Sequence, residues 1–291
     1  MATFTWTEIR SNNLRTSLLF IAFFAIVAGL ATGLGYALGS LILGWGIGIT
    51  FFSVYGLIAY YNGSNMALSL NGAEAADQSQ YRVLHNVVEE IAIAASIPKP
   101  DVYIMKDEAP NAFATGMQPD NSAVAITTGL LRDLDRNELS GVIAHEIAHI
   151  KHQDTKTMLI AGVLVGSIAI LSDLLFRVSI FSERGRNNWL FILLGIASMI
   201  LAPVVAELIR LAVSRKREFA ADAKAVELTR NPKGLAGALQ KLKDATEQME
   251  QSTRSLNHLY IRSELGDSSI MDRLFSTHPP LDDRISKIQS L

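Results

Sequence analysis

The sequence predicts an α+β membrane protein, in which a mainly helical domain with a small β-sheet is combined with two N-terminal transmembrane helices and a membrane hairpin. Three observations predict this class. Hydrophobic residues make up 49% of the chain and charged residues only 19%, whereas soluble domains carry about 25% charge. A long N-terminal run lacks charge altogether. The region after it combines helical and strand-like periodicity.

Composition also excludes some kinds of partner and site. The net charge of −2 gives no sign of nucleic-acid binding, which requires a clear excess of basic residues. The chain contains no cysteine, so it has neither disulfides nor a thiolate metal site. Any metal ion would therefore be held by His, Asp or Glu side chains.

The N-terminal part predicts two membrane spans. The run from Thr16 to Ala73 contains no Asp, Glu, Lys or Arg and is too long for one span of about 20 residues. We expect spans at Ser17–Leu34 and Leu41–Tyr61, with a turn at Gly33–Ser40. A cleaved signal peptide is the alternative for the first, but its apolar stretch runs directly into a second one. Three glycines of the second span would allow close helix approach: Gly44, Gly46 and Gly48.

A globular region begins after Glu74. Apolar residues recur at helical spacing in Gln78–Ser96, which predicts a helix. Three short β-like pieces follow it: Val102–Met105, Ala112–Thr115 and Ala123–Thr127. Turn residues separate these pieces, so we expect a small sheet.

The helix predicted after this sheet, Glu138–His152, carries the motif HExxH, with Asp135 as a candidate N-cap. His145 and His149 are four residues apart and therefore lie on one face, about 5–6 Å from each other, with Glu146 beside them. Such a five-residue pattern also occurs by chance. Here the helix is otherwise largely apolar, and two histidines on a buried face need a partner. The spacing predicts a zinc site.

Zinc bound to such a motif lowers the pKa of a coordinated water to about 7, and a nearby carboxylate takes the proton as the water attacks a peptide carbonyl. Glu146 is the candidate for this base.

An exposed edge of the sheet could pair with an extended peptide substrate. The candidate strand consists of Asn111, Ala112, Phe113 and Ala114. An ordinary core hairpin is the alternative, and periodicity does not separate the two.

Two further apolar stretches, Met158–Leu171 and Trp189–Ala206, follow the motif. Each could be a membrane span or a buried helix, and we expect a membrane hairpin with its apex at Ser182–Arg186. Basic residues favour one side, which predicts that both termini and the motif lie in the cytoplasm, close to the membrane. Those expected in the cytoplasm are Arg10, Arg15, Lys151, Lys156, Arg215, Lys216 and Arg217, against Arg177, Arg184 and Arg186 outside.

A catalytic zinc usually takes three protein ligands and leaves a fourth position open. The candidates for the third ligand are His152, Asp154 and Glu218. His152 is about 10.5 Å from His145 along a straight helix, which is too far for one ion, and Asp154 has a similar problem. A hairpin folded at Arg184 has arms of nearly equal length, which returns Glu218 beside His149.

The residues around Glu218 support this choice. Asp222 lies four residues later, on the same helical face, and the alanines between and after them would let this helix approach the motif closely. A ligating His usually donates its second N–H to a carboxylate, so Asp222 is a candidate to orient one. The alternative is a solvated acidic pair balanced by the basic residues 215–217.

Together these motifs resemble the HtpX-type membrane zinc metalloproteases, which are similar to the CAAX prenyl endopeptidase family. The resemblance rests on residues 145–149, on 214–222, on Asn111–Gly116 upstream and on Thr277–Pro280 downstream. It implies one zinc ion per chain held by His145, His149 and Glu218, with Glu146 as base. It also implies a bacterial inner membrane protein with a cytoplasmic catalytic domain that cleaves damaged or misfolded membrane proteins, in a role linked to heat or envelope stress.

We therefore expect an anchor at 1–64, a first catalytic part at 65–156, a membrane hairpin at 157–209 and a second catalytic part at 210–291.

In the final part, His278 before Pro279 could be a simple turn residue. In the family, such a His and the Arg after it line the active site, which implies that His278 and Arg284 stabilise the oxyanion or occlude the zinc. His85 and His258 are expected to be ordinary polar residues.

Two other classes of function compete with a protease. A membrane scaffold could keep a metal site without turnover, but it would need only the ligands and not Glu146. A transporter-like bundle could use Asp173 and Glu207 as intramembrane charges, but the large polar domain and the complete zinc motif argue against it.

Overall fold

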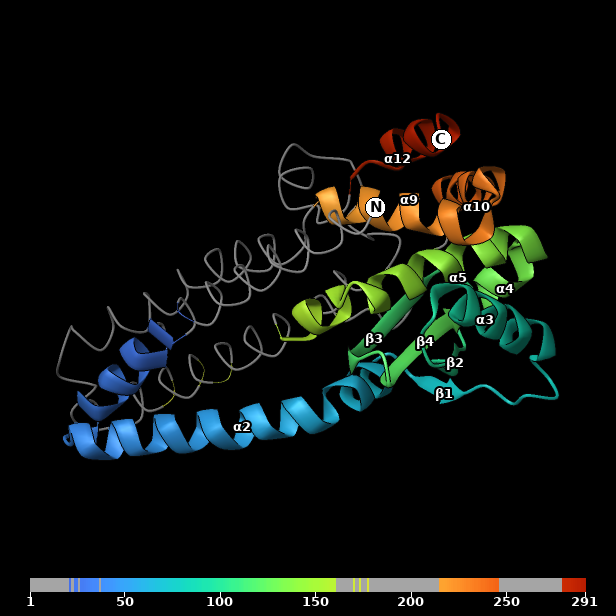
Figure 1. The fold of residues 1–291 in the computed structure, drawn as a ribbon. Helices are drawn as coiled ribbons and strands as arrows, with labels where there is room; N and C mark the ends of the chain where they lie inside the picture. The colour runs from blue at the N-terminus through green and yellow to red at the C-terminus, as the bar shows by residue number, and fades with distance from the viewer. Residues whose placement is uncertain are drawn as a thin grey trace. The chain divides into compact units, whose positions relative to one another are not determined.

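The computed structural model describes residues 27–36, 38–160, 215–245 and 279–291, with isolated positions at 21, 24, 25, 170, 173 and 177 (Figure 1). The chain divides into two compact units. Among the described segments, residues 27–62 belong to one unit, and Gly63–Leu159, 215–245 and 279–291 belong to the other. Most of the predicted membrane hairpin with its apex, and also Glu207, His258 and His278, lie outside the described residues.

Helix α2 (Leu41–Leu70) contains the second predicted span. It begins at the predicted residue, Leu41, and continues beyond the predicted end at Tyr61. Its segment Leu41–Ile58 is the one helix in the described part of the chain that is long and apolar enough to cross a membrane. Val27–Tyr36 is a shorter apolar helix. The first predicted span begins outside the described residues and stays a prediction.

Glycines bring this shorter helix close to α2. A Cβ atom on Gly44 would lie 2.3 Å from the Cα of Gly35, and one on Gly48 would lie 2.7 Å from the Cβ of Ala31, so neither position has space for a side chain. Gly46 has no such neighbour within 4 Å. Glycines four apart on one helix face are a known means of close helix packing in membranes. The predicted close approach therefore depends on Gly44 and Gly48 and not on Gly46.

The second unit contains a four-stranded mixed sheet with the order β1-β2-β4-β3. Strands β2 and β4 are parallel, and the other two pairs are antiparallel. The strands are β1 (Ala73–Ala75), β2 (Asp101–Met105), β3 (Ala112–Gln118) and β4 (Asn121–Thr127). The three predicted strands are confirmed. β1 was missed because three residues are too short to give a periodic signal.

Six described helices lie against this sheet or against one another: α3 (Arg82–Ala95), α4 (Thr128–Asp133), α5 (Arg136–Lys151), α9 (Arg215–Thr229), α10 (Pro232–Asp244) and α12 (Leu281–Gln289). Helix α5 is central, because it contacts α3, α9, α10 and β3 (Figure 1). Every residue from Gly141 to Ile150 is buried, as expected for a helix that is apolar on most of its faces.

An N-terminal capping box and a glycine contact determine where helix α5 begins and how closely it packs against α10. Asp135 is the N-cap: its carboxylate accepts from the backbone N–H groups of Asn137 and Glu138, and the Glu138 side chain accepts from the Asp135 N–H, which completes a capping box. Gly141 allows α10 to approach, since a Cβ there would lie 2.7 Å from the Cα of Leu235. Helix α5 is therefore capped at its N-terminus and packed closely against α10.

Candidate metal centre

His145 and His149 lie on one face of α5, as their spacing predicted. Their rings meet edge to face with centroids 4.6 Å apart, and their Nε2 atoms are 3.1 Å apart. Both side chains are almost completely buried. The two nitrogen atoms therefore point at the same small volume next to the helix.

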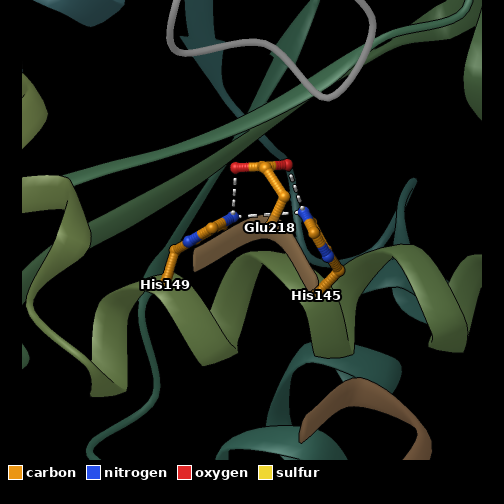
Figure 2. A group of neighbouring side chains, drawn as sticks. All are labelled: His145, His149 and Glu218. Atoms are coloured by element: carbon orange, nitrogen blue, oxygen red, sulfur yellow. Dashed lines mark hydrogen bonds and ion pairs between the residues drawn. The ribbon is translucent and has the colours of Figure 1, made fainter. Parts of the chain in front are cut away.

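Glu218, from the first turn of α9, completes this group (Figure 2). Its Oε1 lies 3.5 Å from the His149 Nε2 and its Oε2 lies 3.7 Å from the His145 Nε2. Ligand atoms of the three residues lie within 4.8 Å of one another, and all three residues are buried. Of the three candidates for the third position, Glu218 is the one that reaches both histidines.

The other two candidates lie where the helix ends. α5 stops at Lys151, His152 is its C-cap, and Gln153 adopts a left-handed conformation with φ 58°. The helix therefore ends within one residue of the predicted end at His152 and does not continue straight toward Asp154. After the turn, the Asp154 carboxylate lies 3.0 Å from the Nδ1 of His149, on the side of the ring away from Glu218.

Asp222 takes the equivalent place beside the other histidine. Its Oδ1 lies 2.9 Å from the His145 Nδ1, in agreement with the orienting role expected from the sequence. Arg284 of α12 donates two hydrogen bonds to the same carboxylate, from Nε at 2.9 Å and from Nη2 at 2.7 Å. Arg284 is fully buried, and its Nη1 lies 3.6 Å from Glu218. The C-terminal helix therefore contributes directly to the walls of the site.

A second arginine lies on the His149 side and was not identified from the sequence. The Nη1 of Arg217 lies 3.4 Å from the Asp154 Oδ1, and the Arg217 side chain is 8% exposed. From the sequence, Arg217 counted only as a basic residue on the cytoplasmic side and as one of the cations that could balance Glu218 and Asp222. Its position immediately before Glu218 was the one available signal.

Glu146, the predicted base, is buried next to this group. Burial raises the pKa of its carboxyl to about 7, the charge of Glu218 also raises it, and His149 and a hydrogen bond from the Ala114 backbone lower it. A carboxyl group with a pKa near neutral can both accept and return a proton at physiological pH.

The candidate substrate strand lies next to Glu146. Ala112, Phe113 and Ala114 are in β3, which is an edge strand of the described sheet and contacts α5. Asn111 precedes it, and its backbone exchanges hydrogen bonds with Thr127 of β4. All four residues are buried, so an edge open to solvent is not observed. Their role toward a substrate stays a prediction.

The electrostatics of the two histidines fit a bound cation. Burial and the charge of Arg284 lower the pKa of His145 to about 4. Burial lowers the pKa of His149, but the hydrogen bond to Asp154 and the charge of Glu218 outweigh it and raise that pKa to about 9. The metal-free site thus holds a proton on His149, and the Nε2 atoms and Glu218 converge around one positive charge. A metal ion bound there would displace this proton and supply positive charge in its place.

The donor set fits zinc chemistry. Two imidazole nitrogens and one carboxylate form a common three-ligand set of catalytic zinc. In both rings Nδ1 faces a carboxylate, so Nε2 is left for the metal. His85 plays no part in this site, because its Nε2 lies 3.0 Å from the Ala76 carbonyl oxygen.

Comparisons with known proteins identify a family and several similar proteins. The model of peptidase family M48 matches residues 78–291. The protein named Protease HtpX homolog of Caldanaerobacter subterraneus subsp. tengcongensis is 38% identical, over 99% of this chain and 98% of its own length. The protein of the same name from Listeria innocua is 40% identical, over 98% and 99%. Among solved structures, S. mikatae Ste24p has a similar fold, with a TM-score of 0.55, 17% identity and coverage of 98% of this chain and 67% of that one.

Proposed function

The chain belongs to peptidase family M48 and is a membrane metalloprotease, and we propose that it is an endopeptidase that depends on one zinc ion held by His145, His149 and Glu218. The main support for this proposal is the arrangement of the three ligand groups. The two Nε2 atoms and the Glu218 carboxylate converge in a buried volume, while both Nδ1 atoms lie against carboxylates. Because the Nδ1 atoms of His145 and His149 are engaged by carboxylates, their Nε2 atoms are the nitrogens that can bind a metal ion.

The chemistry of the reaction can be assigned to these residues. Zinc supplies Lewis-acid chemistry, because it polarises a peptide carbonyl and lowers the pKa of water to about 7. Glu146 would take the proton of the attacking water and return it to the leaving amine, and its burial beside the two histidines fits this role. The fixed charges of Asp154 and Asp222 keep both imidazoles oriented.

The substrate strand and the arginine of α12 complete the proposal. The edge strand β3, with Ala112, Phe113 and Ala114 and the preceding Asn111, would pair with an extended peptide. The hydrogen bond between the Ala114 backbone and Glu146 supports this proposal. Arg284 acts by holding Asp222 and by its charge near Glu218, because it is fully buried and engaged by both. His278 remains a candidate for the active site by resemblance to the family.

We further propose that the substrates are damaged or misfolded membrane proteins, cleaved at the cytoplasmic face of a bacterial inner membrane under stress. The apolar helix segment Leu41–Ile58 supports the anchor. The excess of basic residues predicted on one side supports the cytoplasmic orientation. The HtpX name of the relatives is consistent with the stress role.

The test combines metal analysis with turnover. The wild-type protein and Glu146→Gln are purified in detergent, their bound zinc is measured, and each is incubated with an unfolded membrane protein. We expect one zinc per chain in both proteins and a loss of cleavage in Glu146→Gln of at least about 10²–10⁴-fold, because only the base is removed. Glu90→Gln, an exposed change on α3, serves as the control. Normal turnover by zinc-loaded Glu146→Gln would exclude this mechanism, and zinc binding without any turnover by wild type would favour a scaffold.

A further inference from the structure

Helix α9 contacts both histidines of the metal centre, and it reaches both ring nitrogens of His145 but only the Nε2 of His149. Glu218 lies opposite both Nε2 atoms, and Asp222 lies 2.9 Å from the Nδ1 of His145. The remaining ring nitrogen, the Nδ1 of His149, faces Asp154, which comes from the segment after α5. Arg217 of α9 lies against this Asp154.

The contacts form a chain of three side chains. The guanidinium Nη1 of Arg217 lies 3.4 Å from the Oδ1 of Asp154, and the Oδ2 of Asp154 lies 3.0 Å from the Nδ1 of His149. Asp154 is 2% exposed and Arg217 is 8% exposed. Each oxygen of the carboxylate therefore has its own charged or polar neighbour, and the pair is largely screened from water.

The same arrangement exists on the other histidine. Arg284 holds Asp222, and Asp222 accepts from His145. The two chains come from different elements, since Arg284 belongs to α12 and Arg217 to α9. Each carboxylate that contacts a histidine Nδ1 is thus itself paired with an arginine, which indicates that both histidines are oriented in the same way.

Asp154 needs such support because of where it lies. It follows the left-handed residue Gln153, where the chain leaves α5, and its position is not fixed by that helix. The next residue, Thr155, donates a 3.0 Å hydrogen bond from Oγ1 to the carbonyl of Gly116 and anchors the backbone on the side of β3. These backbone contacts do not set the orientation of the Asp154 carboxylate. Arg217 lies within ion-pair distance of this carboxylate and can hold it toward His149.

We propose that Arg217 is a positioning residue of the metal centre, which acts through Asp154 to hold His149 in its metal-binding orientation. This inference rests on the proposed zinc site. Arg217 and Glu218 are consecutive on α9, so one turn of this helix supplies both the third ligand and the support of the second. The docking of α9 on α5 therefore sets the geometry of two of the three ligands together.

The test is a double-mutant cycle on the rate of zinc release to a chelator, measured with the full-length zinc-loaded protein in detergent. Arg217→Met keeps the aliphatic length and removes the charge, and Asp154→Asn removes the carboxylate. We expect Asp154→Asn to release zinc about 10–100-fold faster than wild type, and Arg217→Met about 10-fold faster. Because Arg217 acts through Asp154, the double variant should release zinc no faster than Asp154→Asn alone.

Two controls accompany the cycle. Lys224→Met removes a positive charge from the same helix outside the site and should release zinc at the wild-type rate. Arg217→Lys keeps the charge and is measured in both backgrounds in case the Met variant does not fold. It should speed release with Asp154 present and have no effect in the Asp154→Asn background.

The outcomes separate this inference from the proposed function. If wild type binds no zinc, the proposed function fails. If wild type binds zinc but the folded Arg217 variants release it at the wild-type rate, or if their effects multiply with that of Asp154→Asn, the role of Arg217 is overturned. A lower unfolding temperature of the metal-free variants with unchanged zinc release would identify a purely structural contact and would also overturn it.

Discussion

The Oδ1 atom of Asp222 lies 2.9 Å from the Nδ1 atom of His145, and this contact determines which nitrogen of the ring faces the metal site. In a neutral histidine only one nitrogen carries a proton. A carboxylate at Nδ1 holds the proton there and leaves the lone pair of Nε2 directed at Glu218 and His149. Arg284 in turn lowers the pKa of Asp222 to about 2 against the opposing effect of burial, so the carboxylate stays charged.

Asp222→Asn should therefore weaken the site without removing a ligand. The amide oxygen can still accept a hydrogen bond from His145, but the charge that stabilises the ring and pairs with Arg284 is lost. We expect zinc affinity to fall about 10–100-fold, as measured by competition with a chelator of known affinity. Asp244→Asn, an exposed change at the end of α10, should have no effect. An unchanged affinity in Asp222→Asn would show that the contact does not orient His145.

Packing between α5 and α10 gives a prediction about stability. A Cβ on Gly141 would lie 2.7 Å from the backbone of Leu235, which cannot move aside, whereas a Cβ on Gly237 would meet only the flexible end of Glu138 at 3.1 Å. Gly141→Ala should therefore lower the free energy of unfolding by about 1–3 kcal/mol. Gly237→Ala, also within a helix, should be neutral or stabilise by up to about 1 kcal/mol. Urea unfolding in detergent measures both changes, and equal effects would contradict the packing argument.

Much of the metal centre could be predicted from the sequence because it depends on local spacing. The four-residue separation of His145 and His149 and the capping signal of Asp135 both follow from helix geometry. Glu218 could be predicted from the near-equal lengths of the chain on either side of Arg184. The family, the enzyme class and the small sheet are confirmed.

The parts that were missed depend on contacts that sequence spacing does not report. α5 ends at Lys151 through a left-handed Gln153, and neither a glycine nor a proline marks that position. The approach of Asp154 to His149 follows from this turn and could not be expected on a straight helix. The contact between Asp154 and Arg217 joins distant parts of the chain, and ion pairs of this kind leave no periodic signal.

Zinc binding should depend on pH in a direction set by His149. The pKa of His149 is raised to about 9 in the metal-free protein, so at pH 7 the ring carries a proton that zinc must displace. Protonation therefore competes with binding below pH 9, and affinity should rise by up to about tenfold per pH unit from pH 7 to 9. Above pH 9 it should level off. Competition titrations at several pH values test this, and an affinity that is constant between pH 7 and 9 would contradict it.

The identity of the third ligand can be decided by comparing two single substitutions. Glu218 lies 3.5 Å from His149 and 3.7 Å from His145 by its two oxygens, whereas His152 is the C-cap residue beyond the helix. Glu218→Ala should lose zinc and proteolysis together, because two histidines bind zinc far more weakly than three ligands do. His152→Ala should bind nearly one zinc per chain and cleave at close to the wild-type rate. Bound zinc is measured in detergent after removal of excess metal, with circular dichroism as the check on folding. A zinc-free His152→Ala protein together with a zinc-loaded Glu218→Ala protein would show that the third ligand comes from the end of α5 and that the assignment to α9 is wrong.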